Sequence, residues 1–230
     1  MRRMSSRLAL VLTVCAAAAL TACGGGSSKK TPAAVPLTEA KAKTVAAAGI
    51  LTAADLPGYT AADQTHDASN DETDKKLATC LGVPAETYLT RNFGKSFTKG
   101  QLEIDSSVDV ATSAASARTQ LTALTSSKAP DCLKSTLTEL LATSGLTVTS
   151  FTATPTSVRV SGADATFGYK LAFAGAGKGQ QISFSGYEVG SLVGQVQVAV
   201  SVLASSAGTF SFDDTVALLT TATGRVKAAS

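Results

Sequence analysis

The sequence predicts an α+β domain in which helices come first, followed by a mainly antiparallel sheet of about five strands and a closing helix. Three observations predict this class. Segments rich in strong helix formers fill much of the chain between residues 38 and 142. After Gly145 the chain changes to stretches rich in Val, Thr, Phe and Tyr, separated by turn residues, as is typical of strands. The last 18 residues then return to a helical pattern.

The first part of the domain is expected to be helical with one long loop. Helix formers over 38–48 are followed by a glycine suited to a C-cap, which predicts a first helix. Residues 51–59 predict a short helical turn that a proline interrupts. The polar, acidic stretch 61–74 predicts an exposed loop, which leads into a helix over about 72–81.

A strand and two helices are expected next. Apolar residues on alternate positions of 102–110 predict the strand. Thr112 or Ser113 can cap the following helix, in which Ala115, Leu121 and Leu124 share a face. A further helix starts at Pro130 and runs to about Ala142, with its leucines directed inward.

The C-terminal part supplies most of the predicted sheet. Strands are expected at 146–153, 157–173, 181–189 and 192–203. The turns between the last three are expected at 175–179 and at Gly190-Ser191. The closing helix begins at Asp213-Asp214 and has Arg225 and Lys227 near its end, as the helix dipole favours.

The N-terminus has the layout of a signal peptide. Three arginines precede an apolar run over residues 8–20, which would span only about 20 Å as a helix and is too short to cross a membrane. The stretch Leu20-Thr21-Ala22-Cys23 resembles the bacterial lipobox, whose cysteine receives diacylglycerol. The alternative is ordinary cleavage near Ala22, with Cys23 left as a free thiol. We expect residues 1–22 to be removed and the chain to be anchored by fatty acyl chains, such as palmitate, on Cys23.

Two further segments follow from this processing. Residues 23–36 are predicted to be a flexible tether, and 37–230 a single α+β domain. Removal of 1–22 takes three arginines away and leaves 17 basic against 17 acidic side chains. The near-neutral mature chain has no basic surface suited to nucleic acid. With lipid on Cys23, we expect the chain to lie on the outer face of the cell membrane.

Cysteine use agrees with export. The domain keeps Cys80 and Cys132, and two cysteines in an exported chain usually pair. A bond across 52 residues would stabilise the fold by about 4 kcal/mol through loop-closure entropy. No metal site is expected, because the chain has no CxxC spacing and His66 is its single histidine.

The order of segments also resembles that of a known family. Four motifs carry the resemblance: ILTAADLPGY at residues 50–59, LATCLGVP around Cys80, APDCL around Cys132 and TATGRVKAA in the final helix. With them the chain resembles actinobacterial cell-envelope lipoproteins similar to the extracellular sensor domain of mycobacterial serine/threonine kinases. The resemblance implies a compact module with a groove for an unidentified ligand, and it brings no catalytic residues. The kinase domains usually carry two disulfides, whereas one is possible here, and Asp131 replaces an aromatic residue.

No catalytic motif stands out. A serine hydrolase would need His66, and no GxSxG elbow is present, so His66 is expected to be an exposed loop residue. The glycines at 175–179 lack the full phosphate-loop pattern and indicate a hairpin turn. The acids between Asp63 and Asp74 do not fit an EF-hand and indicate a solvated loop. The stripe Phe167, Tyr169, Leu171 and Phe173 could line a cavity but is more typical of a core.

Three functional hypotheses remain. The first is a non-enzymatic ligand-binding or sensor-like module with no cofactor, which takes a small molecule, a lipid or a protein. The second is a lipid or glycolipid carrier, which would need an apolar cavity of several hundred Å³. The third is an enzyme that uses only carboxylates, which would require two facing buried acids with raised pKa values. No spacing in the sequence predicts such a pair.

Overall fold

The computed structural model describes residues 36–64, 68–143, 145–177, 180–205 and 210–230. The predicted signal peptide, the expected lipidation site Cys23, the predicted tether up to residue 35 and His66 lie outside these ranges. None of the helices in the described ranges is long and apolar enough to span a membrane.

The predicted α+β class is confirmed. The described residues form five helices, which are α1 (Glu39–Gly49), α2 (Ala68–Leu81), α3 (Ala114–Leu124), α4 (Ala129–Thr143) and α5 (Phe212–Ala229). They also form eight strands, which are β1 (Thr60–Asp63), β2 (Tyr88–Phe93), β3 (Lys95–Lys99), β4 (Leu102–Ala111), β5 (Thr147–Pro155), β6 (Ala165–Gly177), β7 (Gln180–Val193) and β8 (Val196–Ser205).

The strands make one antiparallel sheet with β4 and β8 at its centre. The order is β1-β3-β4-β8-β7-β6-β5, and β2 pairs with the same edge of β4 as β3 does. β4 pairs with β8 over nine residues, from Leu102 opposite Ala204 to Val110 opposite Val196. β4 is therefore paired along both of its edges, and its two faces are left to pack against helices.

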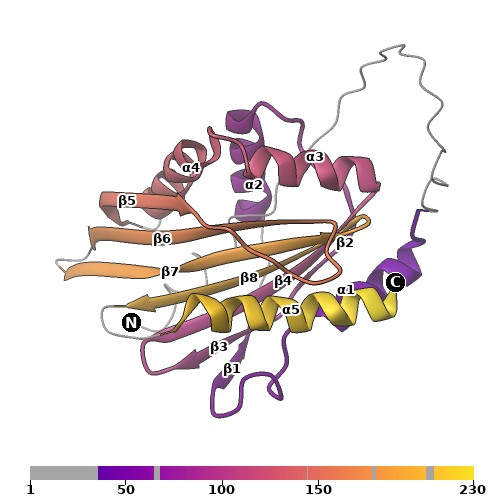
Figure 1. Ribbon diagram of the computed structural model, residues 1–230. Coiled ribbons are helices and arrows are strands. Elements are labelled where there is room, and N and C mark those ends of the chain that lie inside the picture. The colour runs from indigo at the N-terminus through magenta and orange to yellow at the C-terminus, as the bar shows by residue number, and fades with distance from the viewer. Residues whose placement is uncertain (1–35, 65–67, 144, 178–179, 206–209) are drawn as a thin grey trace.

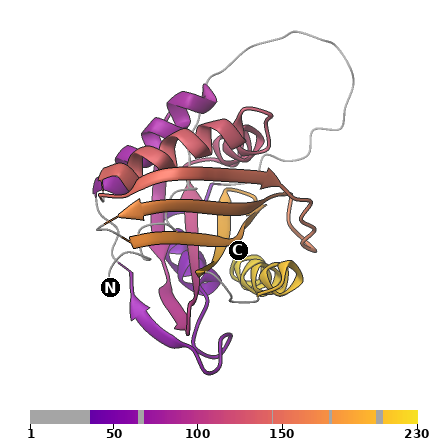
Figure 2. The ribbon, with the colours of Figure 1, turned by 90° about the vertical axis from the view of Figure 1, so that its left-hand side faces the viewer.

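Helices cover the sheet on both sides (Figures 1 and 2). α2, α3 and α4 lie together on one face, while α1 and α5 lie together on the other. The two hydrophobic cores follow this division. The core under α1 and α5 takes the apolar alternate residues of β4 and β8, such as Ile104, Val108 and Val200. The core under α2–α4 is built largely from β6 and contains the aromatic residues of that strand.

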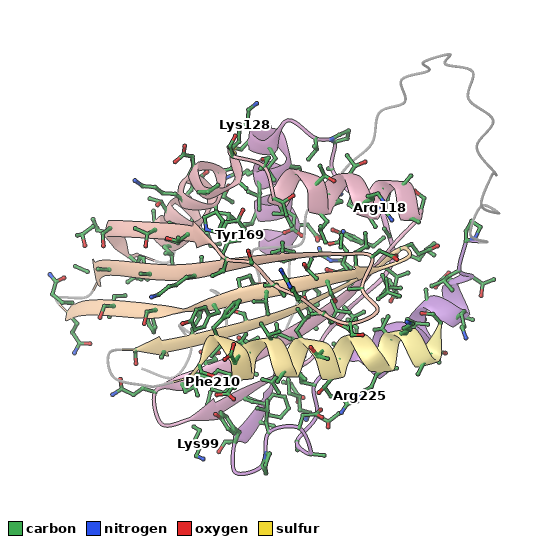
Figure 3. All side chains as sticks on the ribbon, viewed as in Figure 1. Lys99, Arg118, Lys128, Tyr169, Phe210 and Arg225 are labelled. Atoms are coloured by element: carbon green, nitrogen blue, oxygen red, sulfur yellow. A yellow bond between two sulfur atoms is a disulfide. The ribbon has the colours of Figure 1, made fainter. Side chains whose placement is uncertain are left out.

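The stripe of Phe167, Tyr169, Leu171 and Phe173 is core, as its pattern indicates. All four side chains are buried in the cluster beneath α2–α4. The Tyr169 hydroxyl donates a hydrogen bond to the Leu124 carbonyl at the end of α3, and Figure 3 shows its ring directed toward these helices. The polar tip of the buried ring is thereby satisfied.

The helix ends agree with the expected caps in part, since Ser113 caps α3 as expected, whereas Gly49, the expected C-cap of the first helix, is the last residue of α1 and Ile50 is the C-cap. The Ser113 hydroxyl accepts a hydrogen bond from the Ser116 amide at 3.1 Å, and the Ser211 hydroxyl accepts one from the Asp214 amide at 3.0 Å. Asp213 and Asp214 lie in the first turn of α5, where acidic side chains favour the positive end of the helix dipole. Their role as capping acids is confirmed.

The expected number of strands is too low, because three short ones were missed. β1, β2 and β3 contain only four to six residues each and have little alternation of apolar residues. The expected loop over 61–74 is wrong in part, since it contains β1 and the start of α2. The helix predicted at about 72–81 begins at residue 68.

The boundaries of the later strands also differ from the prediction. Residues 157–164 are not part of a strand, and Val158 and Val160 pack instead in the core under α1 and α5. Gly190 lies within β7 rather than in a turn. The residue must be glycine because a Cβ there would meet the Phe167 ring at 2.0 Å. The turn occurs at Gly194, whose φ of 60° suits glycine. Residues 175–177 belong to β6, so the first predicted turn begins later than expected.

Candidate functional site

The acidic residues of β4 point to the face of the sheet that α2–α4 cover. Ile104 and Val108 face the opposite core, and strand alternation places Glu103, Asp105 and Asp109 on the α2–α4 side. All three acids are buried, and Asp109 is only 1% exposed. Buried carboxylates must be paired, hydrogen-bonded or protonated, and the chain uses these solutions at two places.

At the first place, one arginine holds three carboxylates. Arg91 of β2 lies directly opposite Asp109 in the β2–β4 register, and its Nε is 3.1 Å from Asp109 Oδ1. Arg91 Nη2 is 2.8 Å from Asp74 Oδ2, and Nη1 is 3.2 Å from Asp71 Oδ1. We call Arg91, Asp71, Asp74 and Asp109 the Arg91 cluster. Each nitrogen of the guanidinium is thus directed at a different carboxylate.

α2 supplies two of these acids because of its helical period. Asp74 is followed at helical spacing by Leu77, Ala78 and Leu81, which are all buried in the core. Asp74 therefore lies on the inward stripe of α2 and is only 3% exposed. Asp71, one turn earlier, lies at the rim and is exposed.

Two aromatic rings flank the guanidinium. The Arg91 Cζ is 4.6 Å from the centre of the Tyr88 ring and 5.2 Å from that of Phe93. A guanidinium over an aromatic face gains cation–π stabilisation and is screened from water. The rings therefore help to fix the position of Arg91.

The charges of the cluster shift its pKa values. Burial raises the pKa of Asp74 well above its ordinary value; Arg91 opposes this shift in part, and Asp109 adds to it. Burial alone would lower the pKa of Arg91, but Asp109 and Asp74 outweigh it and raise that pKa. One guanidinium does not fully compensate three carboxylates, so the cluster keeps an excess of acceptors.

A cavity of about 390 Å³ opens beside the Arg91 cluster. Its lining comes from α2, the 85–87 segment and β2, and carbon atoms make up the larger part of its surface although most of the residues carry polar or charged groups; the residues are Asp71, Asp74, Lys75, Ala85, Glu86, Thr87, Tyr88, Thr90 and Arg91. This volume lies within the range of small-molecule sites. The Glu86 carboxylate is held by α3, because it accepts hydrogen bonds from Ser116 Oγ at 2.5 Å and Gln120 Nε2 at 2.9 Å. Burial raises the pKa of Glu86.

At the second place, carboxyl groups face each other without a cation in the row. Asp105, Ser201 and Glu188 are successive register partners across β4, β8 and β7. We call Asp105 and Glu188 the carboxyl pair. The Gln64 side-chain amide donates a hydrogen bond to Asp105 Oδ1, and Ser96 Oγ donates to Glu103 Oε1 at 2.7 Å.

Protonation replaces ion pairing there. Burial, with the neighbouring Glu103, raises the pKa of Asp105 to about 8. Burial also raises the pKa of Glu188 well above its usual range, although Ser201 hydrogen-bonds to it. These are the two facing buried acids that a carboxylate-only enzyme would require. The space between them is about 10 Å³, however, which is enough for about one water molecule and too small for a substrate.

The predicted cysteines are joined in the structure. The Cys80 and Cys132 sulfur atoms are 2.07 Å apart, and the bond links α2 to the first turn of α4. α2 also carries Asp71 and Asp74, so the disulfide fastens the helix that supplies half of the Arg91 cluster.

The acids that were compared with a calcium loop do not converge. Asp63 pairs with Lys95 at 3.0 Å and Glu72 with Lys75 at 2.8 Å, while Asp71 and Asp74 contact Arg91. Over the described part of the chain, no group of three or more His, Cys, Asp or Glu side chains is arranged to hold a metal ion.

Two further cavities bear on the carrier hypothesis. One of about 520 Å³ lies near the start of α5, where Figure 3 labels Phe210, and includes Lys170 and Asp214 in its lining. The other, of about 450 Å³, is lined by hydroxyl groups and Arg159 beside Phe167. Both are large enough for part of a lipid, but each carries charged and hydroxyl side chains in its wall.

Sequence reasoning missed the residues of both acid groups. It singled out Asp71 and Asp74 only as members of a solvated loop, and it did not select Arg91, Asp109, Asp105 or Glu188. One signal was present, since Asp74 occupies the same helical stripe as Leu77, Ala78 and Leu81. An acid on an apolar stripe indicates a buried partner.

Comparison with known proteins gives a likeness in structure but none in sequence. No protein-family model and no curated protein matches the chain. Among solved structures, the extracellular domain of PknH from Mycobacterium tuberculosis aligns with a TM-score of 0.43 and 12% sequence identity. The alignment covers 84% of this chain and 98% of that domain.

Proposed function

We propose that this chain is a lipid-anchored, extracytoplasmic, non-enzymatic binding module that holds a small ligand in the cavity beside Arg91. The observation that carries the proposal is the cavity itself. It combines a volume of about 390 Å³ with buried charged groups whose pKa values are displaced, a combination typical of functional sites.

The rigidity of the wall supports a binding role. Arg91 is fixed by three carboxylates, Glu86 is fixed by α3, and the Cys80–Cys132 bond ties α2 to α4. A site whose side chains are already held loses little entropy when a ligand arrives. The facing acids lie apart from this cavity in a water-sized space, which favours binding over acid–base chemistry.

The anchor is proposed from the N-terminal sequence. The charged start, the apolar run and Leu20-Thr21-Ala22-Cys23 support lipid on Cys23 and a place on the outer face of the membrane. The disulfide fits an oxidising compartment.

The anchor is tested by labelling. Cells that express the full chain are grown with radioactive palmitate, and incorporation is compared between the wild type, Cys23→Ala and Cys15→Ala. We expect label in the wild type and in Cys15→Ala, and none in Cys23→Ala. Equal label in Cys23→Ala would contradict the anchor.

Binding is tested by native mass spectrometry of the mature lipidated chain released from detergent micelles. A small molecule that co-purifies in stoichiometric amount and is lost in Glu86→Ala supports the module. A bound lipid that resists Glu86→Ala but is displaced by changes at Tyr187, near α5, would favour the carrier instead.

A further inference from the structure

We infer that the cavity beside Arg91 takes an organic cation with a primary ammonium group, which binds to Asp74. This inference rests on the proposed binding function and specifies the chemistry of the ligand.

The directions of the Arg91 nitrogens argue against an anionic ligand. Nε faces Asp109, Nη2 faces Asp74 and Nη1 faces Asp71, at 2.8–3.2 Å. An arginine that recognises a phosphate or carboxylate presents its donor fork to the ligand. Here the fork is occupied by the chain's own carboxylates.

The remaining charge at the cavity is negative. Asp71, Asp74 and Glu86 line it, against Arg91 and Lys75. Lys75 lies at the exposed rim and pairs with Glu72 at 2.8 Å. Asp109 adds a further acid behind Arg91. A cation entering this space would meet an excess of carboxylates.

Asp74 provides the atom that awaits a donor. Its Oδ2 lies 2.8 Å from Arg91 Nη2 as an ion pair, but neither oxygen of this buried carboxyl has a hydrogen-bond partner within the described residues, and the residue lines the cavity. A buried acceptor without a donor is costly, and an N–H from a ligand would remove that cost. An ammonium group offers three donors and a positive charge together.

The cation is organic rather than a metal ion. A metal ion needs several ligands around one point, and the described side chains form no such group of three or more acids, cysteines or histidines. The volume of about 390 Å³ also exceeds what a bare ion occupies and leaves room for a carbon skeleton.

The inference is tested with three probes of one length and different charge: 1,5-diaminopentane, 1,5-pentanediol and glutarate. Each is titrated calorimetrically into the mature chain in dodecyl maltoside micelles. We expect the diamine to bind, and the diol and the diacid to bind at least about ten-fold more weakly, as charge-assisted hydrogen bonds imply.

Asp74→Asn keeps the size of the side chain and removes its charge, and we expect it to weaken diamine binding by about ten-fold or more. The matched control is Asp55→Asn. Asp55 also pairs with an arginine, Arg225, but on the opposite side of the sheet, so its loss should leave diamine binding unchanged. Thermal unfolding of each variant checks that it is folded.

A second measurement needs no variant. The titratable groups around Asp74 are Asp71 and Lys75 of α2, Glu86, Tyr88, Arg91 and Asp109. Because burial raises the pKa of Asp74, an arriving ammonium group should displace a proton from it. The diamine stays charged throughout this titration, so its affinity should rise as the pH rises through the raised pKa of Asp74, and calorimetry in two buffers should detect proton release.

Two outcomes overturn the inference and are distinct from failure of the proposed function. If glutarate or pentanediol binds as tightly as the diamine, or if a co-purified ligand has no basic nitrogen, the ligand class is wrong and the binding role stands. If no ligand co-purifies and no probe binds, both proposals fail. Equal diamine affinity of the wild type and Asp74→Asn overturns the role of Asp74.

Discussion

The Arg91 cluster and the carboxyl pair lie on the same face of β4 but are neutralised in different ways. Asp109 meets a guanidinium from β2, whereas Asp105, four residues and about 13 Å earlier on the strand, faces Glu188 and retains a proton. The cation is part of the chain at the first place and is replaced by protons at the second. Only the first place adjoins a cavity of ligand size.

The carboxyl pair and the Arg91 cluster are therefore suited to different roles. A carboxyl that holds a proton inside a space of one water molecule contributes neither charge nor access to a ligand. Three carboxylates around one arginine beside a cavity of about 390 Å³ offer both. Breaking each arrangement should therefore have opposite effects on stability.

The largest effect is expected from Arg91→Met, which removes the countercharge of the Arg91 cluster. Loss of one partner from a buried ion pair costs about 3–5 kcal/mol. Urea denaturation at pH 7 should show this loss, and the loss should shrink at pH 4–5, where the stranded carboxylates take up protons. A change of less than 1 kcal/mol at pH 7 would contradict the assigned role of Arg91.

Breaking the Cys80–Cys132 bond should loosen the Arg91 cluster without touching the carboxyl pair. The double variant Cys80→Ser, Cys132→Ser should lose about 4 kcal/mol through loop-closure entropy. Hydrogen exchange should rise in α2 and at the Arg91 cluster, and remain low across β7 and β8. Uniform exchange over the whole sheet would show that the disulfide does not act locally.

Asp105→Asn should stabilise the chain at neutral pH. Its folded pKa of about 8 lies above the usual value of 3.8, so the folded state keeps a proton that the unfolded state loses. The wild type therefore loses stability as the pH rises from about 4 to 8, and the variant does not. The gain should be small at pH 4 and about 4 kcal/mol at pH 7. A gain independent of pH would contradict the raised pKa.

The smallest effect is expected at the more exposed pair of Asp55 and Arg225; Figure 3 labels Arg225 on α5. Arg225→Met should cost about 1 kcal/mol, since partly exposed pairs contribute little. The hydrogen bond from Arg225 lowers the pKa of Asp55, so the contribution of the pair is present at neutral pH and disappears as the pH falls through that lowered pKa. Asp55 and Asp105 should thus show opposite pH trends in denaturation experiments.

The helices and the order of the two halves could be predicted because their signals are local. Leu133 and Leu137 repeat at helical spacing in α4, Ser113 is a cap residue, and Asp213 and Asp214 lie in the first turn of α5. The short strands could not be predicted in this way, because β1 has no buried residue and depends on pairing with β3. Gly190 predicts a turn by its residue type alone, whereas glycine is required there because Phe167 of the neighbouring strand approaches it closely.

The site depended on contacts that the sequence pattern does not contain. Alternation along β4 identifies one apolar face, but it does not tell whether Asp105 and Asp109 on the other face meet water or a helix. That outcome is decided by α2, which lies some 30 residues earlier and brings Asp74 to Arg91. Asp105 is brought near Glu188, more than 80 residues later in the chain, only through Ser201 of β8, which pairs with both.

The most direct test of the account is a carboxyl-resolved NMR titration of the mature chain in micelles, with and without 1,5-diaminopentane. The account predicts that Asp105 titrates near pH 8 under both conditions. It also predicts that Asp74 titrates well above its ordinary range without the diamine and at clearly lower pH with it. An unchanged Asp74 midpoint, or a midpoint that moves at Asp105 instead, would contradict the assignment of the ligand to the Arg91 cluster.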